Sequence, residues 1–329
     1  MDVVGIFENA LRSAFSPQAA VYALLAIGLN IHYGYTGLLN FGQVGFMLVG
    51  AYGLGITVAI VGWSMWVGIL MGILAAVALA AALGLPTLRL RTDYFAITTI
   101  AAAEVLRFIF RSGPATDLTG GPFGLQSIAN AFYDINPIPA GRHGIGAVQY
   151  SHQQLWVGLV TWGLVALATL AVFLLMRAPW GRVIKSIRED EDAATSLGKN
   201  VFAYKMQSLV LGGVIGALGG IMFAIAGSTV NPQAFLPIVT FFAYTILILG
   251  GSASTLGPII GTIIFWFLFS GFDAFMRQAQ GADVLPSLLE GGNAVGATTF
   301  TLVGLALMLL MIFRPQGIFG NKREMELDV

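Results

Sequence analysis

Long apolar runs separated by short polar links dominate this chain from residue 17 onward. A membrane-spanning helix needs about 20 predominantly apolar residues. Pro17 and Pro258 stand in the first turn of such runs, where a missing N–H is tolerated, and Pro86, Pro179 and Pro315 follow run ends. We therefore expect an all-α polytopic membrane protein of about eight to ten transmembrane helices. The runs that reach or approach the required length are 17–33, 41–61, 64–86, 94–111, 154–176, 206–228, 235–250, 256–275 and 296–313.

The composition supports this fold class. Charged residues make up only 10% of the chain, whereas a soluble protein needs roughly a quarter to cover its surface. The 42 glycines suit membrane helices that pack closely through small side chains. The links between runs are too short to fold alone, so residues 1–329 are expected to form a single transmembrane domain in contact with lipid.

Several function classes are disfavoured by the same composition. Sixteen basic and sixteen acidic residues balance, which argues against a nucleic-acid partner. Cysteine is absent and the three histidines lie far apart, so neither a thiol nucleophile nor a metal site is expected. The chain has no G-x-x-x-x-G-K-[ST] phosphate loop, since its only Gly-Lys pair, at 198–199, is followed by Asn200. We expect no cofactor in this chain, and a membrane-embedded enzyme lacks the convergent polar cluster that it would need.

The orientation follows from the basic residues. Segment 177–205 holds six of the sixteen Lys and Arg residues, which places it in the cytoplasm. Alternation then puts the Arg89/Arg91 link, 251–255 and the tail 314–329 inside. The segments expected outside are 112–153, 229–234 and 276–295.

Residues 1–15 and 33–45 complicate that alternation. Val4, Phe7 and Leu11 share one helical face, which predicts an interfacial helix over 1–15; a frayed lead-in is the alternative. Strict alternation would leave this helix outside, a position that the charge rule disfavours because of Arg12. We therefore expect 33–45, rich in glycine, to dip into the membrane and return, since irregular backbone is tolerated there only where protein or a wet cavity surrounds it.

The dip contains Asn40, Phe41, Gly42 and Gln43, which are candidates for the translocation path. Carboxamides at membrane depth are unfavourable unless they are paired. They would bind a polar substrate, or they would only satisfy the broken backbone of the dip. The residues alone leave both interpretations open.

Glu104 and Arg107 are the most conspicuous charges within a predicted span. Separated by three residues, they can form an intramembrane ion pair and share the desolvation cost. A structural pair is the favoured interpretation and a proton or substrate relay is the alternative, because a single paired acid makes a poor proton path.

The cytoplasmic segment has its own pattern. Pro179 can open a helix, and Arg182, Lys185 and Arg188 recur at spacings of three along one side. An acidic run, Glu189–Asp192, then leads to small residues that end at Gly198, so we predict a short helix, a charged turn and a second helix. Such a helix can seat in a partner's groove, and an ordinary solvated loop is the alternative.

At this point the residues resemble a known family. Asp192-Ala193-Ala194 followed by Gly198 resembles the E-A-A-x-x-x-G signature of ABC importer permeases. Most of the chain resembles the high-affinity branched-chain amino-acid permeases of the LivM-like type. The ordered motifs are YTGLLNFGQVGFMLVGAY (35–52), RTDYFAITTIAAAEVLRFIF (91–110), LTGGPFGL (118–125), GRVIKSIREDEDAATSLGKN (181–200), ILGGSASTLGPIIG (248–261) and IFRPQGIFG (312–320).

The resemblance implies a permease subunit of the bacterial inner membrane. Its partners would be a homologous permease, two cytoplasmic ATPase subunits that carry ATP and Mg, and an extracytoplasmic substrate-binding protein. Thr119, Gly120 and Gly121 would contact the binding protein. The coupling helix over Arg188–Gly198 would receive the ATPase motion; its residues are Arg188, Glu189, Asp190, Glu191, Asp192, Ala193, Ala194 and Gly198. Urea and short-amide importers use similar permeases, and an ATP-independent channel or secondary transporter is a rival class.

Overall fold

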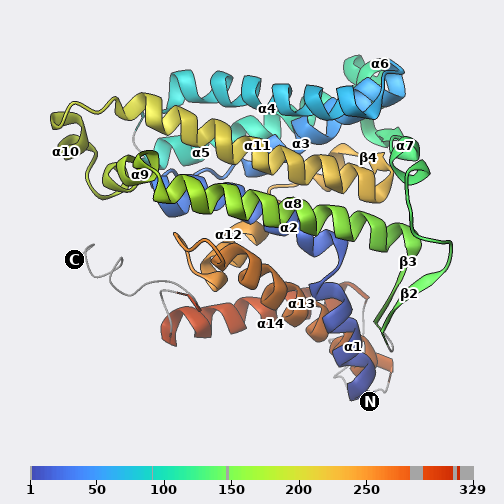
Figure 1. The fold of residues 1–329 in the computed structure, drawn as a ribbon. Helices are drawn as coiled ribbons and strands as arrows, with labels where there is room; N and C mark the ends of the chain where they lie inside the picture. The colour runs from blue at the N-terminus through green and yellow to red at the C-terminus, as the bar shows by residue number, and fades with distance from the viewer. Residues whose placement is uncertain (1, 91, 146–147, 282–291, 314–316, 319–329) are drawn as a thin grey trace.

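The structure is a computed structural model that describes residues 2–90, 92–145, 148–281, 292–313 and 317–318. Each predicted run forms a helix, and most of these helices lie side by side in an elongated bundle (Figure 1). π-Helical segments η1 (Asn30–Tyr35) and η2 (Ile56–Ile60) continue α2 and α3. The apolar helices are α2 (Pro17–Leu29), α3 (Gln43–Gly55), α4 (Met65–Thr87), α5 (Thr92–Arg111), α8 (His152–Arg177), α11 (Val201–Gly227), α12 (Ile238–Gly250), α13 (Gly257–Gly281) and α14 (Gly292–Phe313).

Six helices in the described part of the chain are long and apolar enough to cross a membrane, or seven if the bent α1–α2 pair forms one span. Helix α5 falls outside that set because Glu104, Arg107 and Arg111 crowd its outer half. The helix must therefore place this charged face against protein or water rather than lipid. The fold is that of an all-α polytopic membrane protein.

The two ends of the bundle differ in structure (Figure 1). At one end α9 (Pro179–Glu189) and α10 (Glu191–Ser196) project past the long helices, and Arg89 lies over the Phe202 ring there. This is the end that the basic residues assign to the cytoplasm. The external end carries α6 (Thr116–Thr119), α7 (Asn130–Asp134), and the hairpin of β2 (Arg142–Ile145) and β3 (Val148–Ser151).

The external segment 112–153 is more ordered than a plain loop. Besides the hairpin, β1 (Leu125–Gln126) pairs with β4 (Thr229–Val230), and this pairing ties the segment to the α11–α12 link. The link continues through the short 3-10 helix η5 (Pro232–Ala234) into α12. Two segments that are far apart in sequence therefore form one surface at the external end.

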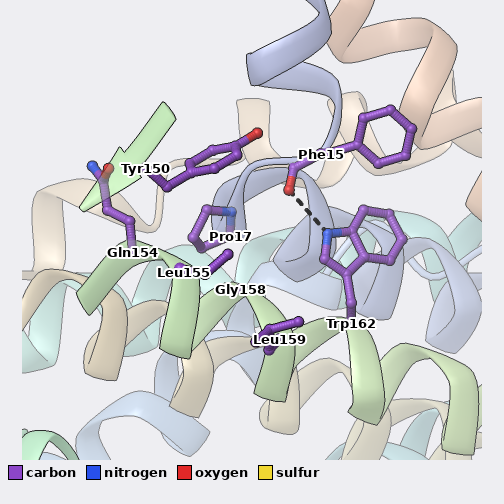
Figure 2. A pocket seen from close by; sticks show the side chains of 8 residues that line it. All are labelled: Phe15, Pro17, Tyr150, Gln154, Leu155, Gly158, Leu159 and Trp162. Carbon is purple, nitrogen blue, oxygen red and sulfur yellow. Dashed lines mark hydrogen bonds between the residues drawn. The ribbon is translucent and has the colours of Figure 1, made fainter. Parts of the chain in front are cut away.

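The N-terminal helix α1 (Val3–Ala14) lies at the external end, so the dip does not move the N-terminus to the cytoplasm (Figure 1). The Tyr150 hydroxyl donates to the Arg12 carbonyl over 2.6 Å, and Trp162 Nε1 donates to the Phe15 carbonyl over 3.1 Å (Figure 2). Burial raises the pKa of the Tyr150 hydroxyl, and the positive charge of Arg12 opposes this shift. The spans therefore alternate strictly in direction from α2 onward.

Of the predicted tail 314–329, only 317–318 lie within the described residues.

The centre of the bundle is α11 packed between α2, α3 and α4. Small residues make this possible: a Cβ on Gly28 would collide with the Gly212 carbonyl, and a Cβ on Gly212 with that of Gly28. Likewise, a Cβ on Gly50 would stand 2.7 Å from the Cα of Ala217. Close backbone approach through small residues is the usual means of helix association in membranes. The high glycine content therefore serves helix packing around α11.

Candidate coupling loop and membrane-embedded polar cluster

The cytoplasmic segment forms two short helices, as its residue pattern predicts. Pro179 opens α9, and Asp190 then leaves the helical conformation (φ −153°, ψ 107°) and caps α10 by accepting a hydrogen bond from the Ala193 N–H over 2.9 Å. Gly198 follows α10 with φ +76°, a left-handed conformation that suits glycine. The expectation of one coupling helix over Arg188–Gly198 is therefore corrected, because the break at Asp190 divides this stretch between α9 and α10.

The two helices pack on the membrane domain through a small apolar cluster. Ile187 of α9, Ala194 of α10 and Val201 of α11 are buried together. Lys205 of α11 forms an ion pair with Glu191 of α10. The loop is therefore held against the first turns of α11 rather than free in solution.

The basic residues of α9 divide between two environments. Arg182 is exposed, whereas Lys185 and Arg188 are half-buried. Arg188 Nη1 donates to the Gly34 carbonyl of η1 over 2.5 Å, and Lys185 Nζ lies 5.8 Å from the Tyr35 ring centroid. Only part of the predicted basic side thus faces solvent.

The outer surface of the loop is acidic with one apolar projection. Glu189, Asp190, Glu191, Asp192 and Ala193 are exposed. Leu197, which follows α10, is 78% exposed. A single exposed leucine is common on protein surfaces, so Leu197 is a candidate contact residue because of its place in this loop and not because of its exposure. Sequence reasoning passed over Leu197, although an apolar residue among charges before a helix-ending glycine was a usable signal.

The segment 36–42 enters the helix bundle from the cytoplasmic end as irregular backbone, as predicted, but it continues into α3 and does not return to the same side, so the predicted return is corrected. The Phe41 N–H donates to Thr99 Oγ1 over 3.1 Å, and a Cβ on Gly42 would collide with the Thr99 carbonyl. Thr99 lies seven residues into α5, which at 1.5 Å per residue is about 10 Å along the helix. Helix α3 therefore starts inside the bundle, where its Val44 N–H donates to Thr240 Oγ1 of α12 over 3.0 Å.

Asn40 and Gln43 are fully buried and hydrogen-bonded internally. Asn40 Oδ1 accepts from the Gly42 N–H over 2.9 Å, while Asn40 Nδ2 donates to Gln43 Oε1 over 3.2 Å and to His32 Nδ1 over 3.1 Å. Gln43 Nε2 donates to the Gly212 carbonyl of α11 over 3.1 Å. These contacts are the ones that a broken backbone needs. Of the four dip residues, only Phe41 keeps partial exposure.

His32 completes this polar cluster and was not singled out from the sequence. Its Nε2 lies 3.2 Å from the Leu209 carbonyl, which can only accept, so Nε2 carries the proton and donates. Nδ1 is then the acceptor for Asn40 Nδ2, which matches the orientation of the Asn40 amide. The cluster His32–Asn40–Gln43 thus links η1, the dip and α11.

Glu104 and Arg107 form the predicted ion pair. Arg107 donates twice, from Nε to Glu104 Oε1 over 2.9 Å and from Nη2 to Oε2 over 2.7 Å. Nη1 donates to Gln233 Oε1 of η5 over 3.3 Å, and the guanidinium lies 4.6 Å from the Phe108 ring centroid. Bidentate geometry together with a link to the α11–α12 connection favours a structural pair over a relay.

The Thr119-Gly120-Gly121 turn is shaped by its glycines, whose φ values are +72° and +54°. Thr119 is buried and its hydroxyl donates to the Phe110 carbonyl over 2.7 Å, while Gly121 is buried as well. These two residues hold the turn rather than present a contact surface. Leu118 and Phe123 are the large apolar side chains exposed beside them, at 50% and 85%.

Comparison with known proteins gives the family. A family model described as branched-chain amino acid transport system / permease component matches residues 12–313. One relative is the high-affinity branched-chain amino acid transport system permease protein LivM of Salmonella typhimurium. The chain is 29% identical to it over 92% of this chain and 68% of that relative. The probable LivM of Methanocaldococcus jannaschii is 24% identical over 92% of this chain and 91% of its own.

A third relative carries a different name. The nucleoside ABC transporter permease protein NupC of Lactococcus lactis is 27% identical over 85% of this chain and 86% of its own. All three relatives are transport permease proteins rather than enzymes. Together with the apolar helices, the match over 12–313 establishes that this chain is a multi-pass inner-membrane protein of the branched-chain amino acid ABC permease family.

Proposed function

We propose that this chain is one permease subunit of an ATP-driven importer for branched-chain or related neutral amino acids. It works with a homologous permease, two cytoplasmic ATPase subunits and an external substrate-binding protein. The observation that carries the proposal is the family match over residues 12–313, combined with a two-helix loop at the cytoplasmic end. ATP and Mg belong to the ATPase subunits.

In this proposal the α9–α10 loop is the coupling element. It joins α8 directly to α11, with only Ala178 between α8 and α9, and α11 is the helix at the centre of the bundle. A push on α9 and α10 when the ATPases close is therefore delivered to the central helix. The spans then rock as rigid bodies between inward-open and outward-open states.

The external turn and the dip have the two remaining roles in this proposal, which are docking of the binding protein and passage of the substrate. Thr119, Gly120 and Gly121 set the turn that presents Phe123, and this surface docks the binding protein. Substrate passes the dip beside Phe41, whose ring lies 5.6 Å from Phe241 and 4.9 Å from Tyr244, between centroids. Apolar rings suit an aliphatic side chain, while Asn40, Gly42 and Gln43 hold the backbone that positions Phe41.

The substrate class is supported by the family description and by the relatives named for branched-chain amino acids. The nucleoside permease shows that related proteins carry other solutes. We would reconstitute the permease pair with its ATPases and binding protein in liposomes and measure uptake of radiolabelled leucine. ATP-dependent uptake that excess isoleucine competes and excess uridine or urea does not is the expected result.

Two results would overturn the proposal. Leucine uptake by the permease alone, without ATPase subunits or ATP, would identify a channel or secondary transporter. Uptake competed by uridine, urea or short amides but not by isoleucine would keep the ATP-driven permease and replace the substrate.

A further inference from the structure

The π-helical segment η1 (Asn30–Tyr35) contacts more separate parts of the chain than its six residues would suggest. It continues α2 at its cytoplasmic end and lies beside α9. π-Helices are rare and occur mostly at functional positions within α-helices. The hydrogen bonds of η1 show which parts of the chain this segment connects.

Asn30 binds the link between α12 and α13. Its Oδ1 accepts from the Ala253 N–H over 2.9 Å, and its Nδ2 donates to the Ser254 carbonyl over 2.8 Å. Ala253 has φ +58°, an uncommon value for alanine, so this link is held in a strained conformation. Asn30 is 1% exposed, and both ends of its amide are used.

The residues that follow Asn30 contact α11 and the dip. His32 contacts the Leu209 carbonyl and Asn40, as described above. Just beyond η1, Thr36 Oγ1 lies 2.6 Å from Ser208 Oγ of α11 and donates to the Ile31 carbonyl over 2.7 Å. Displacement of η1 therefore cannot occur without moving the polar cluster at the start of α3 or breaking buried hydrogen bonds.

Arg188 supplies the contact with the coupling loop. Its Nη1 donates to the Gly34 carbonyl, and its Cγ lies 3.4 Å from the position that a Cβ on Gly37 would take. A charged donor on a backbone carbonyl is stronger than a neutral hydrogen bond. Position 34 must be glycine, because a Cβ there would collide with Asn30 Oδ1 and stand 2.7 Å from the Ala253 nitrogen. One guanidinium thus joins α9 to a segment that is itself bonded to α11, the dip and the α12–α13 link.

We propose that Arg188 is the positioning residue through which movement of the coupling loop reaches the membrane interior, with η1 as the element that distributes it. The proposal rests on the proposed ATP-driven function and adds the route of the motion. The apolar packing of Ile187 and Ala194 holds the loop in place. The Arg188–Gly34 contact, by contrast, links it to the segment that carries His32 and Asn30.

The test replaces Arg188 by Met, which keeps an unbranched stem and removes the guanidinium. The importer is assembled in liposomes, and leucine uptake and ATP hydrolysis are measured on the same preparation. We expect an intact complex and basal hydrolysis within about twofold of wild type, while uptake per ATP falls about tenfold, the scale of one hydrogen bond to a charged group. Arg188→Lys, which retains one cationic donor, should recover part of the loss. Arg142→Met, at an exposed position of β2 at the opposite end of the bundle, is the matched control and should couple normally.

Two outcomes overturn the inference while leaving the proposed function intact. One is wild-type uptake per ATP in Arg188→Met. The other is loss of the ATPase subunits from that variant on size exclusion, which would make Arg188 a docking residue instead. Failure of the proposed function looks different, because the wild-type assembly itself would then show no ATP-dependent uptake.

Discussion

Leu197 offers the sharpest quantitative prediction for the coupling loop. Its side chain is 78% exposed between α10 and Gly198, on the surface that the proposed function assigns to an ATPase subunit. Burying a whole leucine side chain contributes about 1.5–3 kcal/mol, so covering the exposed fraction contributes about 1–2 kcal/mol. Since about 1.4 kcal/mol corresponds to tenfold in Kd, Leu197→Ala should weaken ATPase binding about 5- to 30-fold.

The assay is the Kd of the purified ATPase subunit for the permease pair in lipid nanodiscs, measured by biolayer interferometry. Leu118→Ala is the matched control, since Leu118 is 50% exposed but lies in α6 at the external end. It should leave the Kd unchanged. A Kd for Leu197→Ala within twofold of wild type would refute the assignment of this surface, because no partner could then bury the side chain.

Three further changes test other parts of the structure. Ala194→Arg forces a charged chain into the buried contact with α9 and α11, so ATP-driven uptake should be abolished in protein that still inserts; normal uptake would contradict the role of α10. Arg107→Met leaves the Glu104 carboxylate, 26% exposed, without its cation and should destabilise the protein by about 2 kcal/mol, read as a lower unfolding temperature in detergent. The Tyr52 hydroxyl is buried without a hydrogen-bond partner among the described residues, so Tyr52→Phe should keep or raise that temperature; a marked fall would reveal an unseen partner.

The positions of the long helices could be predicted from the sequence because their signals are local. A run of apolar residues must be long enough for the bilayer core, and prolines favour the ends of such a run, as Pro86 does one residue before the end of α4. The observed helices accordingly begin and end within a few residues of the predicted runs. The same holds for the turn at Asp190 and for the Glu104–Arg107 pair, since their partners lie within a few residues along the chain.

Other features depended on contacts between residues far apart in the sequence. The N-terminal helix lies at the end of the bundle opposite α9 and α10, where Tyr150 binds Arg12 and Trp162 binds Phe15, and local charge did not reveal those partners. Burial in the folded external turn likewise could not be predicted locally: Thr119 is 1% exposed and its hydroxyl donates to the Phe110 carbonyl, whereas Phe123 is 85% exposed.

The sequence by itself determined that the chain spans the membrane many times and where a charged two-helix loop interrupts the spans, and its basic residues predict which end faces the cytoplasm. Only the tertiary structure decided what the polar residues of the dip do, because hydrogen bonds pair Asn40 with His32 and Gln43 with Gly212 of α11. It also decided that Arg188 turns inward to Gly34, 154 residues away. The physical reason is that apolar length is a property of each segment, whereas a buried polar group requires a partner, and the fold alone selects that partner.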